Sequence, residues 1–132
     1  MNQSQPKQIM MIDDDVEDIE IFREFVEKCE IPIQVHHSDD CIEGIAMLKS
    51  LPEIHVIFVD SQMPKMNGFE LIQLIKMDVH LSNIPIVLIS SRFSPSDEHR
   101  AKNVGAFSCI TKSSDYKVYC NELLKVIHNC SN

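Results

Sequence analysis

The chain has 132 residues, 44% hydrophobic and 24% charged, a balance typical of one globular domain with an apolar core. Twelve basic against twenty acidic residues give a net charge of −8, which argues against direct binding of DNA or RNA. No apolar run approaches the roughly 20 residues that span a bilayer, and the start, MNQSQPKQ, has no apolar signal region. We therefore expect a single cytoplasmic domain over residues 1–132, with loose ends at 1–6 and 129–132 and no membrane partner.

Short apolar or β-branched runs alternate along the chain with longer segments of helical period. This alternation is typical of an α/β sheet built from right-handed crossovers. Three of the runs are nearly unbroken apolar stretches, as expected for parallel strands covered on both faces. The sequence predicts a five-stranded parallel sheet, with strands at Gln8–Ile12, Ile33–His37, Val56–Asp60, Ile86–Ser90 and Phe107–Thr111.

Helix starts are marked by side-chain acceptors that stand three residues before an acid, the spacing that satisfies free N–H groups in a first helical turn. After the first of these caps, one apolar stripe is expected to face the core. The cap pairs are Asp15 with Asp18, Asp40 with Glu43, Asn67 with Glu70, and Ser94 with Asp97. The stripe is Ile19, Phe22, Val26 and Cys29, and further helical periods run through Ile42–Leu51, Phe69–Met77, Ala101–Val104 and Val118–Ile127.

Acids, a hydroxyl and one amine stand at the carboxyl ends of the predicted strands, where functional side chains of an open parallel sheet collect. Asp13 and Asp14 follow the first strand, and Asp60 ends the third. Several carboxylates in one pocket repel one another unless a cation lies between them, and a few oxygen ligands favour Mg²⁺. Ser90 and Lys112, at the ends of the fourth and fifth strands, suit the oxygens of a phosphoryl group. A carboxylate held against Mg²⁺ can attack phosphorus and become an acyl phosphate, so the candidate nucleophile is Asp60.

Four blocks of residues together resemble the receiver domain of two-component response regulators, of the stand-alone, chemotaxis-regulator type. The resemblance covers Ile9 to Ile127 and implies a flavodoxin-like, doubly wound fold of strand order 2-1-3-4-5 with five flanking helices. The blocks are Ile12-Asp13-Asp14, then Val59-Asp60-Ser61-Gln62-Met63-Pro64-Lys65-Met66-Asn67-Gly68, then Pro85-Ile86-Val87-Leu88-Ile89-Ser90-Ser91, and Gly105-Ala106 leading to Lys112.

The resemblance implies a phosphorylation switch. Asp60 would accept the phosphoryl group, and Mg²⁺ would be bound by Asp14, Asp60 and the backbone carbonyl of Gln62, with Asp13 acting through water. Ser90 would be the switch hydroxyl, and Lys112 would contact the phosphoryl group. The donor would be a histidine kinase, a phosphotransfer protein or a small acyl phosphate, and slow self-catalysed hydrolysis would end the signal. Such a domain is not a turnover enzyme, and it would signal by contact with an unidentified downstream protein.

Two positions depart from the family pattern. The lysine is usually followed by a proline in a cis peptide bond, but here Ser113 follows, and a cis bond before a residue other than proline costs about 3–4 kcal/mol. We therefore expect a trans bond and a differently placed loop. The switch aromatic of the fifth strand would fall at Cys109, which has no ring to turn inward.

Two alternatives stay open. A dehalogenase-like, Mg²⁺-dependent phosphatase would use the Asp13-Asp14-Asp15 run, but it leaves Asp60 unexplained. A degenerate receiver would keep the fold and bind partners without phosphorylation.

The five cysteines form no CxxC pair, and His36 and His37, as neighbours on a strand, point to opposite faces, so neither set predicts a metal site.

Overall fold

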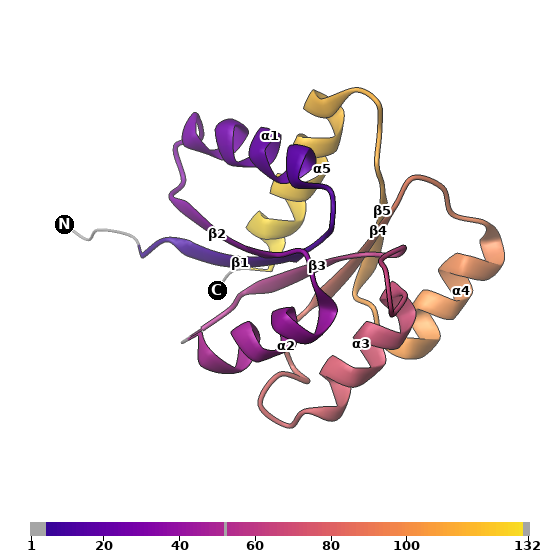
Figure 1. The fold of residues 1–132 in the computed structure, drawn as a ribbon. Helices are drawn as coiled ribbons and strands as arrows, with labels where there is room; N and C mark the ends of the chain where they lie inside the picture. The colour runs from indigo at the N-terminus through magenta and orange to yellow at the C-terminus, as the bar shows by residue number, and fades with distance from the viewer. Residues whose placement is uncertain (1–4, 52, 131–132) are drawn as a thin grey trace.

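The computed structural model describes residues 5–51 and 53–130, and five parallel strands form its single sheet (Figure 1). The strand order is β2-β1-β3-β4-β5, which confirms the predicted order and fold class. The strands are β1 (Lys7–Ile12), β2 (Ile33–Ser38), β3 (Val56–Asp60), β4 (Ile86–Ser90) and β5 (Ser108–Thr111). The helices are α1 (Val16–Glu27), α2 (Cys41–Ser50), α3 (Gly68–Met77), α4 (Pro95–Val104) and α5 (Tyr116–Asn129).

Helices cover both faces of the sheet, α1 and α5 on one side and α2, α3 and α4 on the other (Figure 1). Ile9 and Met11 of β1 pack toward α1 and α5, whereas Met10 and Ile12 pack toward the opposite layer. The strands β3 and β4 repeat this alternation. Because both faces are buried, these strands are continuous apolar runs in the sequence.

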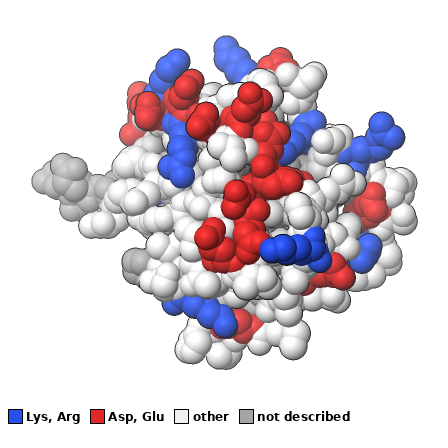
Figure 2. All heavy atoms as spheres, viewed as in Figure 1, with Lys and Arg blue, Asp and Glu red and all other residues white. Residues whose placement is uncertain are grey.

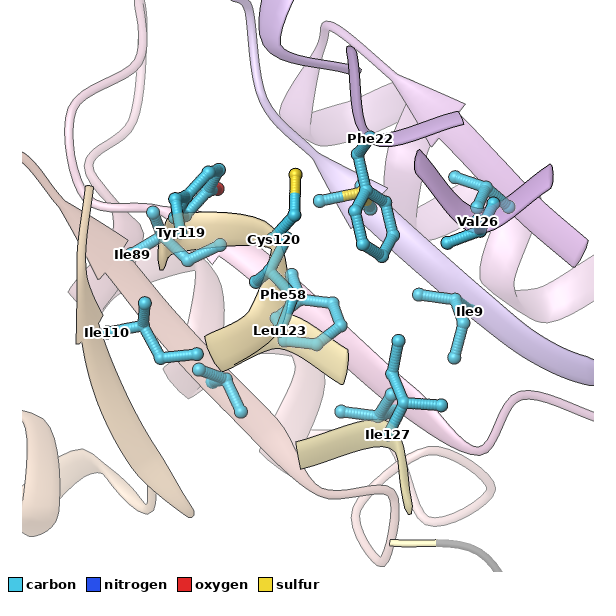
Figure 3. Close-up of a cluster of buried hydrophobic side chains, with 14 of the residues drawn as sticks. Ile9, Phe22, Val26, Phe58, Ile89, Ile110, Tyr119, Cys120, Leu123 and Ile127 are labelled. Atoms are coloured by element: carbon cyan, nitrogen blue, oxygen red, sulfur yellow. The ribbon is translucent and has the colours of Figure 1, made fainter. Parts of the chain in front are cut away.

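The layer under α1 and α5 is filled by large aliphatic and aromatic side chains (Figure 3). Phe22 of α1 and Phe58 of β3 are at most 1% exposed, and Leu123 of α5 is fully buried. Each such side chain stabilises the fold by about 1.5–3 kcal/mol relative to an exposed position. This layer supports the ends of β1, β3 and β4, where the candidate site residues stand.

The four predicted helix caps all form. In each, the side chain of the cap residue accepts a hydrogen bond from the backbone N–H three residues later, and the cap residues are Asp15, Asp40, Asn67 and Ser94. Gly105 ends α4 in the left-handed region (φ 100°), which a residue without a Cβ adopts at little cost. The local cap signals therefore set where the helices begin.

The C-terminal part of the chain differs from the prediction in three places. Helix α5 begins at Tyr116, behind the cap residue Asp115, earlier than the apolar period indicated. It continues to Asn129, and Cys130 packs against the core, so the prediction of loose ends is wrong for residues 129 and 130. Phe107 lies outside β5 and is 58% exposed. The predicted loose ends at 1–4 and 131–132 lie outside the described residues.

The first helix also ends earlier than its apolar stripe indicated. Helix α1 stops at Glu27, and Cys29 lies half-buried beyond it. All described peptide bonds are trans, including the bond between Lys112 and Ser113. In the part of the chain that the structure describes, no helix has the length and apolar character to cross a membrane.

Candidate functional site

Three carboxylates meet at the carboxyl edge of the sheet, because β1 and β3 are neighbours and end side by side. Asp13, Asp14 and Asp60 each offer a carboxylate oxygen, and these oxygens lie within 4.8 Å of one another. Asp13 is buried, Asp60 is half-buried and Asp14 is exposed. The sequence predicted this grouping, and the sheet register produces it.

The half-buried Asp60 carboxyl holds its proton more tightly than an ordinary aspartate. Burial, and after it the negative charge of Asp13, raise the pKa of Asp60 to about 7. The backbone N–H of Gln62 donates to its Oδ1 (3.2 Å), which only partly offsets these effects. A cation placed among the three acids would remove this repulsion.

The donor set of this acidic edge fits a small divalent cation. All three side chains offer hard carboxylate oxygens, which Mg²⁺ prefers. The buried Oδ2 of Asp13 lies 3.2 Å from the ammonium of Lys112 but accepts no hydrogen bond among the described residues, while its Oδ1 accepts one from the backbone N–H of Asp15 (2.8 Å). The residues present therefore match the ligands that a magnesium site needs.

The ammonium of Lys112 lies close to two carboxylates, that of Asp13 directly after β1 and that of Asp18 on α1. Its Nζ is 3.2 Å from Oδ2 of Asp13 and 2.7 Å from Oδ2 of Asp18. Burial alone would lower the pKa of Lys112, but the contact with Asp18 and the charges of Asp13 and Asp60 outweigh it and raise the pKa. Lys112 therefore remains a cation.

Ser90 ends β4 at the same edge, next to the end of β3. Its hydroxyl is buried and donates to the backbone carbonyl of Arg92 (2.9 Å). A groove of about 470 Å³ runs beside it and is lined by Gln62, Ser90, Ser91, Arg92, Phe93, Ser94 and Asp97. Gln62 is exposed at the mouth of this groove, two residues beyond Asp60. The structure thus places Ser90 and Gln62 at the predicted edge, with no direct contact between Ser90 and Asp60 among the described hydrogen bonds.

Gly68 explains why the loop after Asp60 ends in Asn-Gly. A Cβ on Gly68 would lie 2.7 Å from the backbone oxygen of Asp60 and 2.7 Å from a methyl group of Leu88. Asn67 and Glu70 form a complete capping box at the same point. The start of α3 is thereby held against the end of β3, and any side chain at residue 68 would displace the backbone of Asp60.

Two residues near the acids were not predicted as part of the site. Asp18 is only 7% exposed and contacts Lys112, although the sequence indicated only a helix-capping role. Tyr119 of α5 is 2% exposed, and burial followed by the charge of Asp13 raises its pKa. One sequence signal could have revealed Asp18: it precedes Phe22 and Val26 in steps of four, so it continues the buried face of α1.

Acidic side chains also spread over the surface around this edge. Figure 2 shows them gathered over α1 and in a band that reaches the start of α2. Exposed members include Glu17, Glu20, Glu24 and Glu27 of α1. The surface of this region is therefore strongly negative, in keeping with the net charge of −8.

The comparison with known families agrees with this arrangement. A family model described as the response regulator receiver domain matches residues 9–124. The chain belongs to this family. The match includes the Asp60 block, which the dehalogenase-like alternative leaves unexplained, so that alternative loses its basis. A receiver domain is a signalling domain of two-component systems and not a turnover enzyme.

The curated relatives differ in how much of their own length the match covers. Two-component response regulator ORR3 of Oryza sativa is 36% identical over 74 residues, which are 54% of this chain and 56% of that protein. Sensor histidine kinase CheAY of Helicobacter pylori is 30% identical over 107 residues, 79% of this chain and 13% of that protein. The aligned part thus spans about half the length of the rice regulator and a small part of the kinase.

Solved structures show the same fold. The phosphorylated cyanobacterial phytochrome response regulator RcpA has a TM-score of 0.81 at 25% identity, covering 92% of this chain and 91% of that one. The chemotaxis protein CheY4 of Vibrio cholerae has a TM-score of 0.82 at 22% identity, covering 96% of this chain and 100% of that one. Receiver domains interact with histidine kinases and with downstream targets.

Proposed function

We propose that this receiver domain is a phosphorylation switch whose phosphoacceptor is Asp60. The observation that carries the proposal is the grouping of Asp13, Asp14 and Asp60 within 4.8 Å, with the ammonium of Lys112 3.2 Å from Asp13. The crystal structure of RcpA, 25% identical to this chain, is of a phosphorylated response regulator, which supports the same chemistry here.

In the proposed step, a carboxylate oxygen of Asp60 attacks phosphorus and forms an acyl phosphate. The bond from phosphorus to the donor breaks, and its electron pair leaves with the imidazole nitrogen of a phosphohistidine or with the carboxylate of acetyl phosphate. Lys112 and Ser90 would hold phosphoryl oxygens, and for this the Ser90 hydroxyl must turn away from the carbonyl of Arg92. Hydrolysis of the acyl phosphate returns the carboxylate and ends the signal.

Asp13, Asp14, Asp60 and the backbone carbonyl of Gln62 would hold Mg²⁺. When bound, the ion neutralises the carboxylates and polarises the phosphoryl oxygens. The chain's own residues orient Asp60 for the attack: the N–H of Gln62 holds one carboxylate oxygen, and Gly68 lets α3 approach the backbone of Asp60. A histidine kinase or a phosphotransfer protein would be the donor, and an unidentified downstream protein would bind the phosphorylated form.

The test is intact-mass spectrometry after incubation with acetyl phosphate and Mg²⁺. We expect one added phosphoryl group on the wild type and none on Asp60→Asn. Asp39→Asn is the matched control, because it removes an exposed aspartate that directly follows β2. This variant should be labelled normally. Undiminished labelling of Asp60→Asn would refute the assignment of the nucleophile.

A wild type that takes no label from acetyl phosphate, and does not bind beryllofluoride in the presence of Mg²⁺, would favour the degenerate receiver. Sustained turnover of p-nitrophenyl phosphate that survives Asp60→Asn but is lost in Asp13→Asn would instead favour phosphatase chemistry. The two substrates therefore separate a switch from both alternatives.

A further inference from the structure

The ammonium of Lys112 is held by two carboxylates that come from different elements. Its Nζ is 2.7 Å from Asp18 on α1 and 3.2 Å from Asp13 after β1. The side chains are 16% exposed for Lys112, 8% for Asp18 and 3% for Asp13. An ammonium has three N–H donors, so the close contact with Asp18 and the ion pair with Asp13 leave at least one donor for a further acceptor.

Helix capping does not explain the side chain of Asp18. In α3 and α4, the acid three residues after the cap reaches back to the backbone N–H of the cap residue, as Glu70 does for Asn67 and Asp97 for Ser94. In α1, the backbone N–H of Asp18 is bonded to Asp15, but its carboxylate turns to Lys112 instead. Burying a charge costs free energy unless it is paired, so the structure keeps Asp18 buried only together with Lys112.

Apart from Asp13 and Asp18, no partner in the described hydrogen bonds and ion pairs holds the end of the Lys112 side chain. The backbone N–H of Lys112 donates to the carbonyl of Ser90 (2.7 Å), which fixes its main chain next to β4. Ser113 follows where the family has proline, and regular structure resumes only at Tyr116. A lysine side chain has many rotamers, so a second carboxylate further restricts where its ammonium lies.

We propose that Asp18 is a positioning residue for phosphoryl transfer, which holds the ammonium of Lys112 so that its remaining donor is available to the phosphoryl group on Asp60. This inference rests on the proposed function. Among the described hydrogen bonds and ion pairs, none joins Asp18 to Asp13, Asp14 or Asp60. Its effect must therefore pass through Lys112.

If Asp18 has this role, its loss should change the affinity for a phosphoryl mimic much more than the affinity for Mg²⁺. Lys112 is a donor to phosphoryl oxygens and not a metal ligand, so losing its anchor should weaken binding of a phosphoryl mimic and leave Mg²⁺ binding nearly unchanged. An acid of purely structural importance would alter both affinities together, or alter only the stability of the fold.

The experiment measures Mg²⁺ affinity, and then beryllofluoride affinity at saturating Mg²⁺, by isothermal titration calorimetry. For Asp18→Asn we expect about five- to tenfold weaker beryllofluoride binding, as for the partial loss of one charge-assisted hydrogen bond, and Mg²⁺ affinity within about twofold of wild type. Glu17→Gln is the matched control, because it removes an exposed charge from the same helical turn and should change neither value. Asp18→Glu restores the charge and should recover part of the loss.

A double-mutant cycle with Lys112→Gln tests whether the effect passes through the lysine. In the Lys112→Gln background, Asp18→Asn should change beryllofluoride affinity by less than about twofold. Unchanged or tighter beryllofluoride binding by Asp18→Asn overturns the inference, and so does an equal loss in both backgrounds.

A second measurement separates this inference from the proposed function. In a ¹⁵N-edited spectrum without Mg²⁺ or beryllofluoride, the ammonium of Lys112 should be protected from exchange in the wild type and lose this protection in Asp18→Asn. Absence of protection in the wild type overturns the Asp18 contact itself. Protection in a wild type that does not bind beryllofluoride refutes the proposed function, and the positioning role with it.

Discussion

The apolar layer under α1 and α5 lies next to the acidic edge of the sheet, but the two regions differ in what they contain. The layer buries apolar side chains, whereas the edge gathers charged ones. Phe22, Phe58 and Leu123 in the layer are at most 1% exposed and belong to one cluster of buried hydrophobic side chains (Figure 3). At the edge, Asp13 is 2% exposed, and its Oδ2 accepts no hydrogen bond among the described residues. The layer stabilises the fold, whereas the edge gathers carboxylates whose repulsion a cation would relieve. The difference indicates that the fold tolerates an unfavourable edge because its interior is strongly favourable.

The largest expected effect belongs to the layer. Phe58→Ala should lower the free energy of unfolding by about 3–5 kcal/mol, because it removes a buried ring and leaves a cavity in the middle of the sheet. Urea denaturation followed by circular dichroism measures this change. Phe107→Ala is the matched control, because that ring is 58% exposed and its loss should cost less than about 1 kcal/mol. A loss for Phe58→Ala no greater than that of the control would show that the layer does not dominate stability.

At the edge, removing the charge of Asp60 should raise the free energy of unfolding, whereas Phe58→Ala should lower it. The pKa of Asp60 is about 7 in the folded chain, against an ordinary value of 3.8. Between these values the folded state binds a proton that the unfolded state has released, so the contribution of Asp60 to stability falls as pH rises from about 4 to about 7. Asp60→Asn carries no such charge. Without divalent cations it should match the wild type near pH 4 and exceed it above pH 7 by about 1–2 kcal/mol, a value reduced for partial exposure.

Denaturation of both proteins in urea with EDTA, at several pH values, measures this difference. Above pH 7, added Mg²⁺ should stabilise the wild type more than Asp60→Asn. It should therefore reduce the difference between their free energies of unfolding. Two outcomes would contradict the assignment of repulsion to this edge. In one, the difference in the free energy of unfolding between the two proteins does not change between pH 4 and pH 8. In the other, Asp60→Asn is less stable than the wild type at every pH.

The same contrast explains how much the sequence could predict. The strands Val56–Asp60 and Ile86–Ser90 were predicted with their observed bounds, because burial on both faces leaves a continuous apolar run. The grouping of Asp13, Asp14 and Asp60 followed from parallel strands ending at one edge. These inferences needed only the local pattern and the direction of the strands.

The contact between Asp18 and Lys112 was not predicted, because it joins residues far apart in the chain. Asp18 satisfied a local rule, the acid three residues after a helix cap, and that rule masked its pairing with Lys112, the residue after β5. The start of α5 at Tyr116 was missed for a related reason: Tyr116 is exposed, and its cap residue Asp115 is followed three residues later by Val118 and not by an acid, so neither signal marked this start. Ion pairs across elements, and exposed first turns, leave no periodic signal.

The smallest expected effect lies where the two regions meet, at Tyr119. Its ring belongs to the apolar layer beside Ile89, but its hydroxyl is buried and has no hydrogen-bond partner among the described residues (Figure 3). A buried hydroxyl without a partner costs about 1–3 kcal/mol of desolvation, so removing it alone should not destabilise the fold. Tyr119→Phe should therefore be as stable as the wild type or more stable by up to about 1 kcal/mol, whereas Tyr119→Leu should lose about 1–3 kcal/mol of ring packing. Urea denaturation of the three proteins at pH 7 measures this. If Tyr119→Phe lost more than Tyr119→Leu, the hydroxyl would have to be satisfied by the acidic edge, and Tyr119 would belong to the edge and not to the layer.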